Sequence, residues 1–146
     1  LQLQTFSDHN IAIAIDSPLG LVVPVINRCQ HLSVAEISKQ ITNLQILAQS
    51  NKLQREHLQN GTISVSNIGS IGGVSASPVI LSPQVCIGAV SRARLLPRYT
   101  PQGTPQPANI VSISWSADHR VLDGATIARF SNRVRHYLEH PLELLI

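Results

Sequence analysis

Aromatic side chains are scarce in this chain of 146 residues, at 3% of the composition, and methionine is absent. Charged residues make up only 13%, whereas 43% of the residues are hydrophobic. A chain of this length and composition is large enough for one domain, with a core of isoleucine, valine, leucine and alanine. Because it has no methionine and starts with Leu1, we interpret it as part of a longer protein.

Several other features that would indicate a particular function are also missing. No apolar run approaches the roughly 18 residues of a membrane span, and the net charge of +3 is mild and scattered. We therefore expect neither a membrane nor a nucleic acid among the partners. The only two cysteines, Cys29 and Cys86, lie far apart within apolar patterns, which predicts buried free thiols and a reducing compartment. No window matches a nucleotide-binding loop or the G-x-S-x-G turn of serine hydrolases.

Hydrophobic patterns predict a two-layer α/β fold. Apolar runs and alternating patterns indicate strands at 11–15, 21–26, 62–66, 83–95 and 109–117. Ser33 and Glu36 form a capping box, which predicts an amphipathic helix from Ser33 to about Gln49. A second helical pattern follows Gly124 and continues until Pro141, and the proline-rich stretch 97–107 is predicted to be a connection. This order favours a mixed β-sheet covered by helices on one face.

The segment 114–124 is the most informative part of the chain, because a strand pattern changes to a helix pattern around His119. A histidine on a short connection between rigid elements is well placed for catalysis. Most histidines on loops have no chemical role, however, and Asp123 is also explained as the N-cap of the final helix. The residues by themselves leave both interpretations open.

Three blocks resemble the dihydrolipoyl acyltransferases, the E2 components of 2-oxo acid dehydrogenase complexes. Residues 114–132 (SWSADHRVLDGATIARFSN) contain the family hallmark D-H-R-x-x-D-G. Residues 10–26 (NIAIAIDSPLGLVVPVI) and 61–83 (GTISVSNIGSIGGVSASPVILSP) resemble two further blocks in the same order. The resemblance covers essentially the whole chain, and details of the blocks at 66–73 and 124–132 favour the branched-chain member. It implies a fold like that of chloramphenicol acetyltransferase.

The resemblance also implies transfer of an acyl group between a dihydrolipoyl thiol and coenzyme A. A thiol attacks a thioester as its thiolate, and we expect His119 to be the base that removes the proton. The attack creates an oxyanion, and the serine of the S-N-x-G block, here Ser66, is expected to donate a hydrogen bond to it. Without the resemblance, a bond from this hydroxyl to its own turn is the better explanation. Asp123 matches a family residue that orders the site through a salt bridge, and its arginine partner lies outside this chain unless Arg120 replaces it.

Further residues are expected to line the site without reacting. The channel for substrate and coenzyme A is expected to include Asn67, Gly69, Arg120 and Gly124. Gly124 is also expected to let the backbone turn tightly into the helix, because it carries no Cβ. We expect no metal: His136 and His140 have i, i+4 spacing, but two ligands without a third are weak evidence. They are better explained by a favourable interaction with the helix dipole.

The resemblance implies a large assembly. Residues 1–146 would be the C-terminal part of a catalytic domain whose N-terminal part, together with the lipoyl and subunit-binding domains, lies outside this chain. These domains form trimers with the site at the subunit boundary, and the trimers build a larger core. The tail at 141–146 is expected to contact a neighbouring trimer or to cap its own domain. Contacts with the E1 and E3 components are expected to come from other parts of the protein.

Two other functions remain as alternatives at this point. The first is an E2-like subunit that does not catalyse and only builds the core or binds partner enzymes. The second is a small-acceptor acetyltransferase of the chloramphenicol type, which shares H-x-x-x-D-G but not the three blocks. The expected compartment is the mitochondrial matrix, or alternatively the bacterial cytoplasm, because both are reducing.

Overall fold

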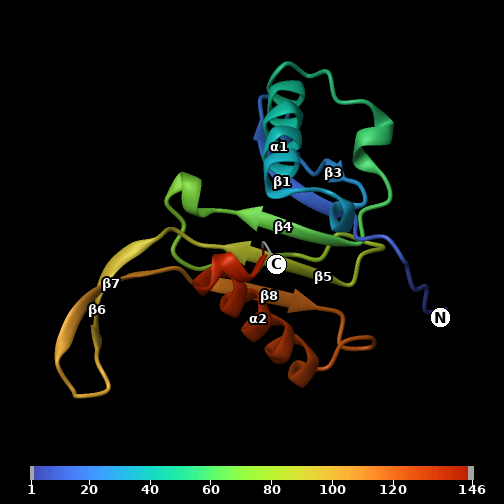
Figure 1. The fold of residues 1–146 in the computed structure, drawn as a ribbon. Coiled ribbons are helices and arrows are strands. Elements are labelled where there is room, and N and C mark those ends of the chain that lie inside the picture. The colour runs from blue at the N-terminus through green and yellow to red at the C-terminus, as the bar shows by residue number, and fades with distance from the viewer. Residues whose placement is uncertain (1, 145–146) are drawn as a thin grey trace.

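The computed structural model describes residues 2–144 (Figure 1). Its strands are β1 (Ile11–Ser17), β2 (Gly20–Val22), β3 (Val25–Ile26), β4 (Ile63–Asn67), β5 (Cys86–Val90), β6 (Arg94–Tyr99), β7 (Pro105–Ile110) and β8 (Ile113–Ala117). The two α-helices are α1 (Val34–Gln49) and α2 (Gly124–Glu139). Four short 3-10 helices join these elements: η1 (Cys29–His31), η2 (Arg55–Leu58), η3 (Gly69–Ile71) and η4 (Pro141–Leu144).

Six of the strands form one mixed sheet in the order β2-β1-β4-β5-β8, with β3 also paired to β1. Strands β1, β4 and β5 run parallel to one another. Strands β2, β3 and β8 are antiparallel to their neighbours. The predicted mixed sheet is therefore confirmed.

Both α-helices cover the same face of this sheet. Ile13, Val65, Gly88 and Trp115 are paired side by side across β1, β4, β5 and β8, and residues paired in this way point to the same face. Ile13 packs against the core cluster to which α1 contributes. Trp115 meets Phe130 of α2 edge to face, with ring centroids 5.1 Å apart. The predicted two-layer arrangement is confirmed.

Helix α1 begins where the capping box predicts. The Ser33 hydroxyl accepts a hydrogen bond from the Glu36 backbone N–H at 3.2 Å, and the Glu36 carboxylate accepts one from the Ser33 N–H at 2.7 Å. The bonds from Ser33 also lower the pKa of Glu36. Leu44 and Ala48 of this helix are buried and complete a core cluster with β1 and β3.

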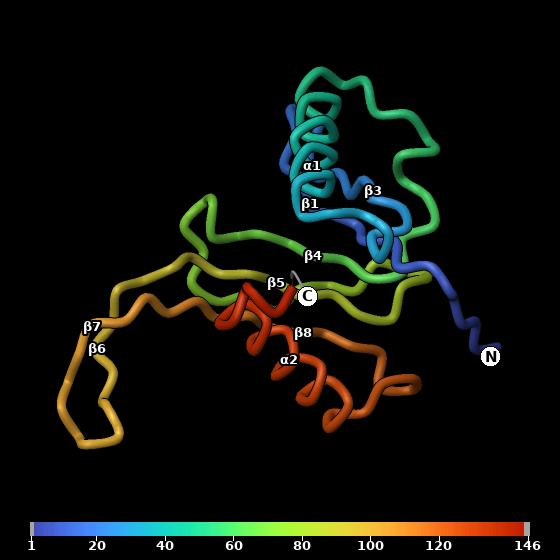
Figure 2. Tube along the Cα trace, viewed as in Figure 1, coloured from blue at the N-terminus to red at the C-terminus, as the bar shows by residue number. Residues whose placement is uncertain are grey.

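The stretch 97–107, predicted to be a connection, is instead most of a β-hairpin. Strands β6 and β7 pair with each other and project away from the main sheet (Figure 2). The Thr100 N–H bonds to the Thr104 carbonyl at 2.9 Å and closes the ladder. Counting from that hydrogen-bonded pair, Pro97, Pro105 and Pro107 all fall in non-hydrogen-bonded pairs. A proline there removes no ladder bond, so the proline content does not prevent strand formation.

Three of the predicted strands are interrupted. The structure divides 21–26 into β2 and β3, 83–95 into β5 and β6, and 109–117 into β7 and β8. The last two interruptions have one cause, because the two neighbouring segments leave the main sheet at positions that face each other. There the Ser91 N–H donates to the Ser112 carbonyl and the Ser112 N–H donates to the Ser91 hydroxyl, both at 2.9 Å.

Both cysteines are free thiols, as predicted. Cys86 is buried in β5, and this burial raises the pKa of its thiol. Cys29 is only partly buried, and its thiol lies 3.3 Å from the Ile26 carbonyl as a donor. The predicted burial is therefore confirmed for Cys86, whereas it is wrong for Cys29.

Between residues 2 and 144, no helix combines the length and the apolar character needed to cross a membrane.

Candidate active site

His119 lies on a tight turn directly after the end of β8. The Asp118 carbonyl accepts hydrogen bonds from the N–H groups of Val121 and Leu122, both at 2.9 Å. The Asp118 N–H continues the pairing with β5 through the Val85 carbonyl at 2.8 Å. These bonds hold the backbone on both sides of His119, whose side chain is exposed. A ligand can therefore reach an imidazole that is carried by a fixed turn.

Arg120 is engaged with Asp118 and not with Asp123. Its Nη2 lies 2.6 Å from the Asp118 carboxylate, and its Nε donates to both oxygens at 2.9 and 3.1 Å. Hydrogen bonds from Arg120 lower the pKa of Asp118 to about 2. Of the two possibilities that the sequence leaves open for Arg120, the described residues show the second, in which Arg120 faces a partner other than Asp123.

Asp123 is the N-cap of α2. Its carboxylate accepts a hydrogen bond from the Thr126 N–H at 2.6 Å. Hydrogen bonding by Thr126 is the main cause of the lowered pKa of Asp123, and the nearby charges of Arg129 and His119 contribute less. The prediction that Gly124 is needed for a tight turn into the helix is wrong, because a Cβ at this position would meet open space. The turn into α2 therefore depends on the cap and not on the absence of a side chain.

Ser66, from the motif block at 61–83, lies near the end of β4 and is partly buried. Within the described residues its hydroxyl makes no hydrogen bond, whereas the neighbouring serines are engaged. Ser64 donates to the Gln84 side chain at 2.6 Å, and Ser70 donates to the Asn67 carbonyl at 3.1 Å. The alternative that the Ser66 hydroxyl bonds its own turn is therefore not observed.

The backbone after Ser66 is held by two neighbouring residues. The Asn67 side-chain oxygen accepts a hydrogen bond from the Gly69 N–H at 3.0 Å. A Cβ on Gly69 would lie 2.7 Å from backbone atoms of Ser91 and Arg92, so this close approach requires glycine. Asn67 and Gly69 thus shape the turn that follows β4, and neither is shown to contact a substrate.

Within one chain, Ser66 and His119 lie at opposite ends of the sheet. Ser66 is level with Ser114 of β8 through the register of β4, β5 and β8. From Ser114 the antiparallel β8 runs toward the start of β5, and at about 3.3 Å per residue Asp118 lies roughly 13 Å away along the strands. Two strand spacings add roughly 10 Å across the sheet. The structure therefore does not bring Ser66 and His119 together.

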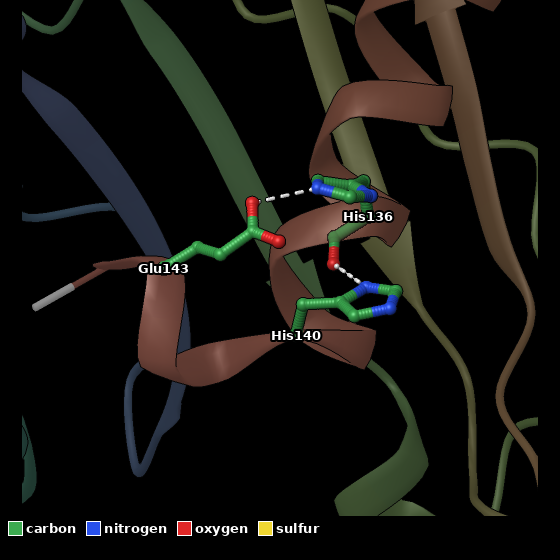
Figure 3. Close-up of side chains that lie close together, drawn as sticks. All are labelled: His136, His140 and Glu143. Carbon is green, nitrogen blue, oxygen red and sulfur yellow. Dashed lines mark hydrogen bonds and ion pairs between the residues drawn. The ribbon is translucent and has the colours of Figure 1, made fainter. Parts of the chain in front are cut away.

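The C-terminal end of α2 holds a cluster of three potential metal ligands, of which the sequence indicated only the two histidines. His136, His140 and Glu143 each offer a ligand atom, and these atoms lie within 4.8 Å of one another (Figure 3). Glu143 comes from η4, which folds back over the last turn of the helix. This turn supplies the third donor that the i, i+4 pair lacks in the sequence, where only the proline at 141 signals a change of direction.

Solved structures of acyltransferase cores share this fold. Dihydrolipoamide acetyltransferase from Azotobacter vinelandii superposes with a TM-score of 0.91 and 33% identity, over 97% of this chain and 58% of that one. That structure belongs to a study of the roles of one serine, one histidine and one asparagine in its catalytic mechanism. The cubic core of a pyruvate dehydrogenase multienzyme complex gives the same TM-score, identity and coverage. The fold is thus that of the acyltransferase cores of 2-oxo acid dehydrogenase complexes, as predicted.

The chain belongs to the family described as 2-oxoacid dehydrogenases acyltransferase (catalytic domain), whose model matches residues 1–146. The lipoamide acyltransferase component of the branched-chain alpha-keto acid dehydrogenase complex, mitochondrial, from Caenorhabditis elegans is 50% identical over 139 residues, which cover 95% of this chain and 31% of that protein. Its Mus musculus counterpart is 49% identical over 140 residues, covering 96% and 29%. This chain therefore spans about a third of the length of the relatives it matches.

Proposed function

We propose that the protein transfers an acyl group, preferably a branched-chain one, between a dihydrolipoyl thiol and coenzyme A. One observation carries this proposal beyond family membership. In the segments 66–70 and 118–123, every polar side chain except Ser66 and His119 makes a hydrogen bond within the described residues. The two side chains with assigned chemistry are therefore the two that remain available to a substrate.

The proposed reaction needs one base and one hydrogen-bond donor. A neutral His119 takes the proton from the attacking thiol, and the thiolate sulfur then bonds to the thioester carbonyl carbon. The carbonyl oxygen becomes an oxyanion, to which the Ser66 hydroxyl donates. When the intermediate collapses, the original carbon–sulfur bond breaks and the departing sulfur takes the proton back from the imidazolium. Histidine suits both steps because its ordinary pKa is near neutrality.

Asp123 has a positioning role in this proposal. It caps the helix that follows His119, and it stands four residues after that histidine, the interval that also separates the histidine and the asparagine studied in the Azotobacter vinelandii enzyme. We assign Asn67, Gly69, Arg120 and Gly124 to the surroundings of the substrate channel. Asn67 and Gly69 support this placement by shaping the turn next to Ser66.

The separation of Ser66 and His119 supports a site shared between two copies of the chain. A base and an oxyanion donor that act on one carbonyl must both lie within hydrogen-bond reach of the reacting atoms. Two residues at opposite ends of one sheet meet this condition when a neighbouring copy supplies one of them. We therefore propose trimers with the site at the subunit boundary, joined into a larger core of the kind seen in the relative that forms a cubic core.

Other elements of the proposal concern the whole protein. Coenzyme A is a substrate, and the lipoyl group is carried on a separate domain. The E1 and E3 components bind through parts outside this chain. The names of the branched-chain relatives support a mitochondrial location.

A transfer assay on the full-length, assembled protein tests this function. It compares acetyl-, succinyl-, isobutyryl- and isovaleryl-coenzyme A with dihydrolipoamide as acceptor. We expect the branched acyl groups to have the higher kcat/KM. The margin should be about 10- to 200-fold, which is the discrimination that one methylene in an apolar pocket provides. Faster acetyl transfer would refute the branched-chain preference, and no transfer of any acyl group would favour the non-catalytic core subunit.

The same assay tests the base. His119→Ala should lower turnover by at least about 10²-fold while folding and assembly persist. His31→Ala is the matched control, because it removes another exposed histidine from a short connection that lies outside all three motif blocks. Normal turnover of His119→Ala would disprove the assignment of His119.

A further inference from the structure

The cluster at the end of α2 has the composition of a metal site. His136 and His140 lie one turn apart, with their rings stacked at 4.6 Å between centroids and 27° between planes. Nε2 of His136 lies 2.7 Å from Oε2 of Glu143 (Figure 3). Two imidazoles and one carboxylate form a common donor set for zinc in proteins. Magnesium and calcium prefer sites made only of oxygen donors, so this set favours zinc and related transition metals.

The hydrogen bonds of the cluster leave donor atoms for an ion. Nδ1 of His140 lies 3.0 Å from the His136 carbonyl, so in the matching tautomer Nδ1 carries the proton and Nε2 keeps its lone pair. Histidines that bind metals usually make such a bond with the ring nitrogen that does not ligate. The proton between His136 and Glu143 is the one that an ion would replace.

The dimensions of the cluster also suit a zinc ion. At zinc–ligand distances of about 2.0–2.1 Å, neighbouring tetrahedral ligand atoms lie roughly 3.3 Å apart. One ring nitrogen of each histidine and one carboxylate oxygen of Glu143 already lie within 4.8 Å of one another. The His136–Glu143 pair must open by roughly 0.6 Å from its hydrogen-bonded distance, and side-chain rotation must bring His140 toward the ion. These are movements of side chains, and the backbone of α2 and η4 can stay in place.

Solvent access and the helix dipole also favour a metal ion at this cluster. The side chains of His136 and Glu143 are 42% and 47% exposed, so water can complete the coordination as a fourth ligand. The negative end of the α2 dipole also favours a positive charge there. Two ligands come from the helix and the third comes from the turn that follows it.

We propose that His136, His140 and Glu143 bind a zinc ion at the C-terminal end of α2. The ion takes the place of the proton between His136 and Glu143, and it ties η4 to the last turn of the helix. Leu142 and Leu144 belong to η4 and are 74% and 52% exposed. Zinc would therefore fix the direction in which these two apolar side chains leave the domain. This site is separate from the proposed acyl-transfer residues.

Zinc binding by the full-length, assembled protein tests this proposal. The protein is first treated with a chelator, and its lipoyl groups are kept oxidised, because reduced dithiols also bind zinc. Competition with a chromophoric chelator then measures the affinity and the number of ions per chain. We compare wild type with His140→Gln and with Glu143→Gln, which keeps the shape of the side chain but removes its charge. His31→Gln is the matched control, because it removes an exposed histidine outside the cluster.

Wild type and His31→Gln should each bind one zinc ion per chain. Both cluster variants should bind it at least about 10-fold more weakly, because loss of even a residue that only supports a metal ligand lowers metal affinity by about 10- to 100-fold. Cobalt added in place of zinc should give the visible spectrum of a four-coordinate site in wild type and lose it in both variants. Equal zinc affinity of Glu143→Gln and wild type would overturn the three-ligand site. Equal affinity of all four proteins, or no binding by wild type, would overturn the proposal as a whole.

Discussion

Two inactive variants should restore activity when their subunits are mixed. In a His119→Ala chain Ser66 is intact, and in a Ser66→Ala chain His119 is intact. Each variant assembled alone has a lesion at every boundary and should be nearly inactive. In mixed trimers, some boundaries join an intact His119 from one copy to an intact Ser66 from its neighbour, and these boundaries should catalyse.

The magnitude follows from the geometry. Ser66 is separated from Asp118, the residue before His119, by roughly 13 Å along the strands and roughly 10 Å across them, far more than the reach of one reacting thioester. Each boundary of a cyclic trimer therefore draws one of the two residues from each side. With equal amounts and random mixing, the His119 side is intact in half of the boundaries and the Ser66 side is intact in half. About a quarter of the boundaries are complete, so activity should reach about a quarter of wild type.

The assay requires unfolding and joint reassembly of the two full-length variants, followed by acyl-transfer measurements at several mixing ratios. Differently tagged subunits verify that the trimers are mixed. Activity should be highest at equal amounts and should vanish at both extremes. Verified mixed trimers that stay as inactive as the parents would show that both residues act within one chain.

Three further predictions concern single positions. Ser66→Ala should lower kcat by about 10²- to 10³-fold with little change in KM, and a higher KM with unchanged kcat would instead assign Ser66 to substrate binding. Gly88→Ala should reduce the free energy of unfolding by about 1–3 kcal/mol in a denaturant titration, because its Cβ would lie 2.5 Å from the Trp115 ring; a change below about 0.5 kcal/mol would contradict this packing. The depressed pKa of Asp118, about 2 against 3.8, means that the pair with Arg120 stabilises the fold above pH 3.8 and is lost as the pH falls through about 2. Arg120→Gln should therefore raise the Asp118 midpoint in an NMR titration, and an unchanged midpoint would contradict the assigned cause.

Local signals predicted the parts of the fold that depend on neighbouring residues. The capping box at Ser33 and Glu36 marks the start of α1 correctly, because both hydrogen bonds are made within one turn. The same holds for Asp123, whose capping bond spans three residues. The hairpin at 94–110 was missed because a proline usually interrupts a strand, and only the pairing register shows that these prolines need no N–H.

The motifs predict which residues form the candidate site, but they do not predict how those residues are arranged. The motifs identify Ser66 and His119, yet the sequence does not show that the pairing of three strands places them at opposite ends of one sheet. Register is a long-range property, because it depends on which residues of different strands face each other. The same limit hid Glu143, since its contact with His136 depends on the path of the chain after the helix ends.

The packing between β5 and α2 gives this chain a natural optical reporter. Trp115 is its only tryptophan, and the indole fills the space left by the missing side chain of Gly88 and packs edge to face with Phe130. The indole nitrogen Nε1 is buried and has no hydrogen-bond partner within the described residues. An indole in such surroundings emits at shorter wavelength than one in water. Its emission wavelength therefore depends on the packing of α2 against the sheet. Fluorescence can thus report changes in the contact between this helix and β8, the strand that precedes His119.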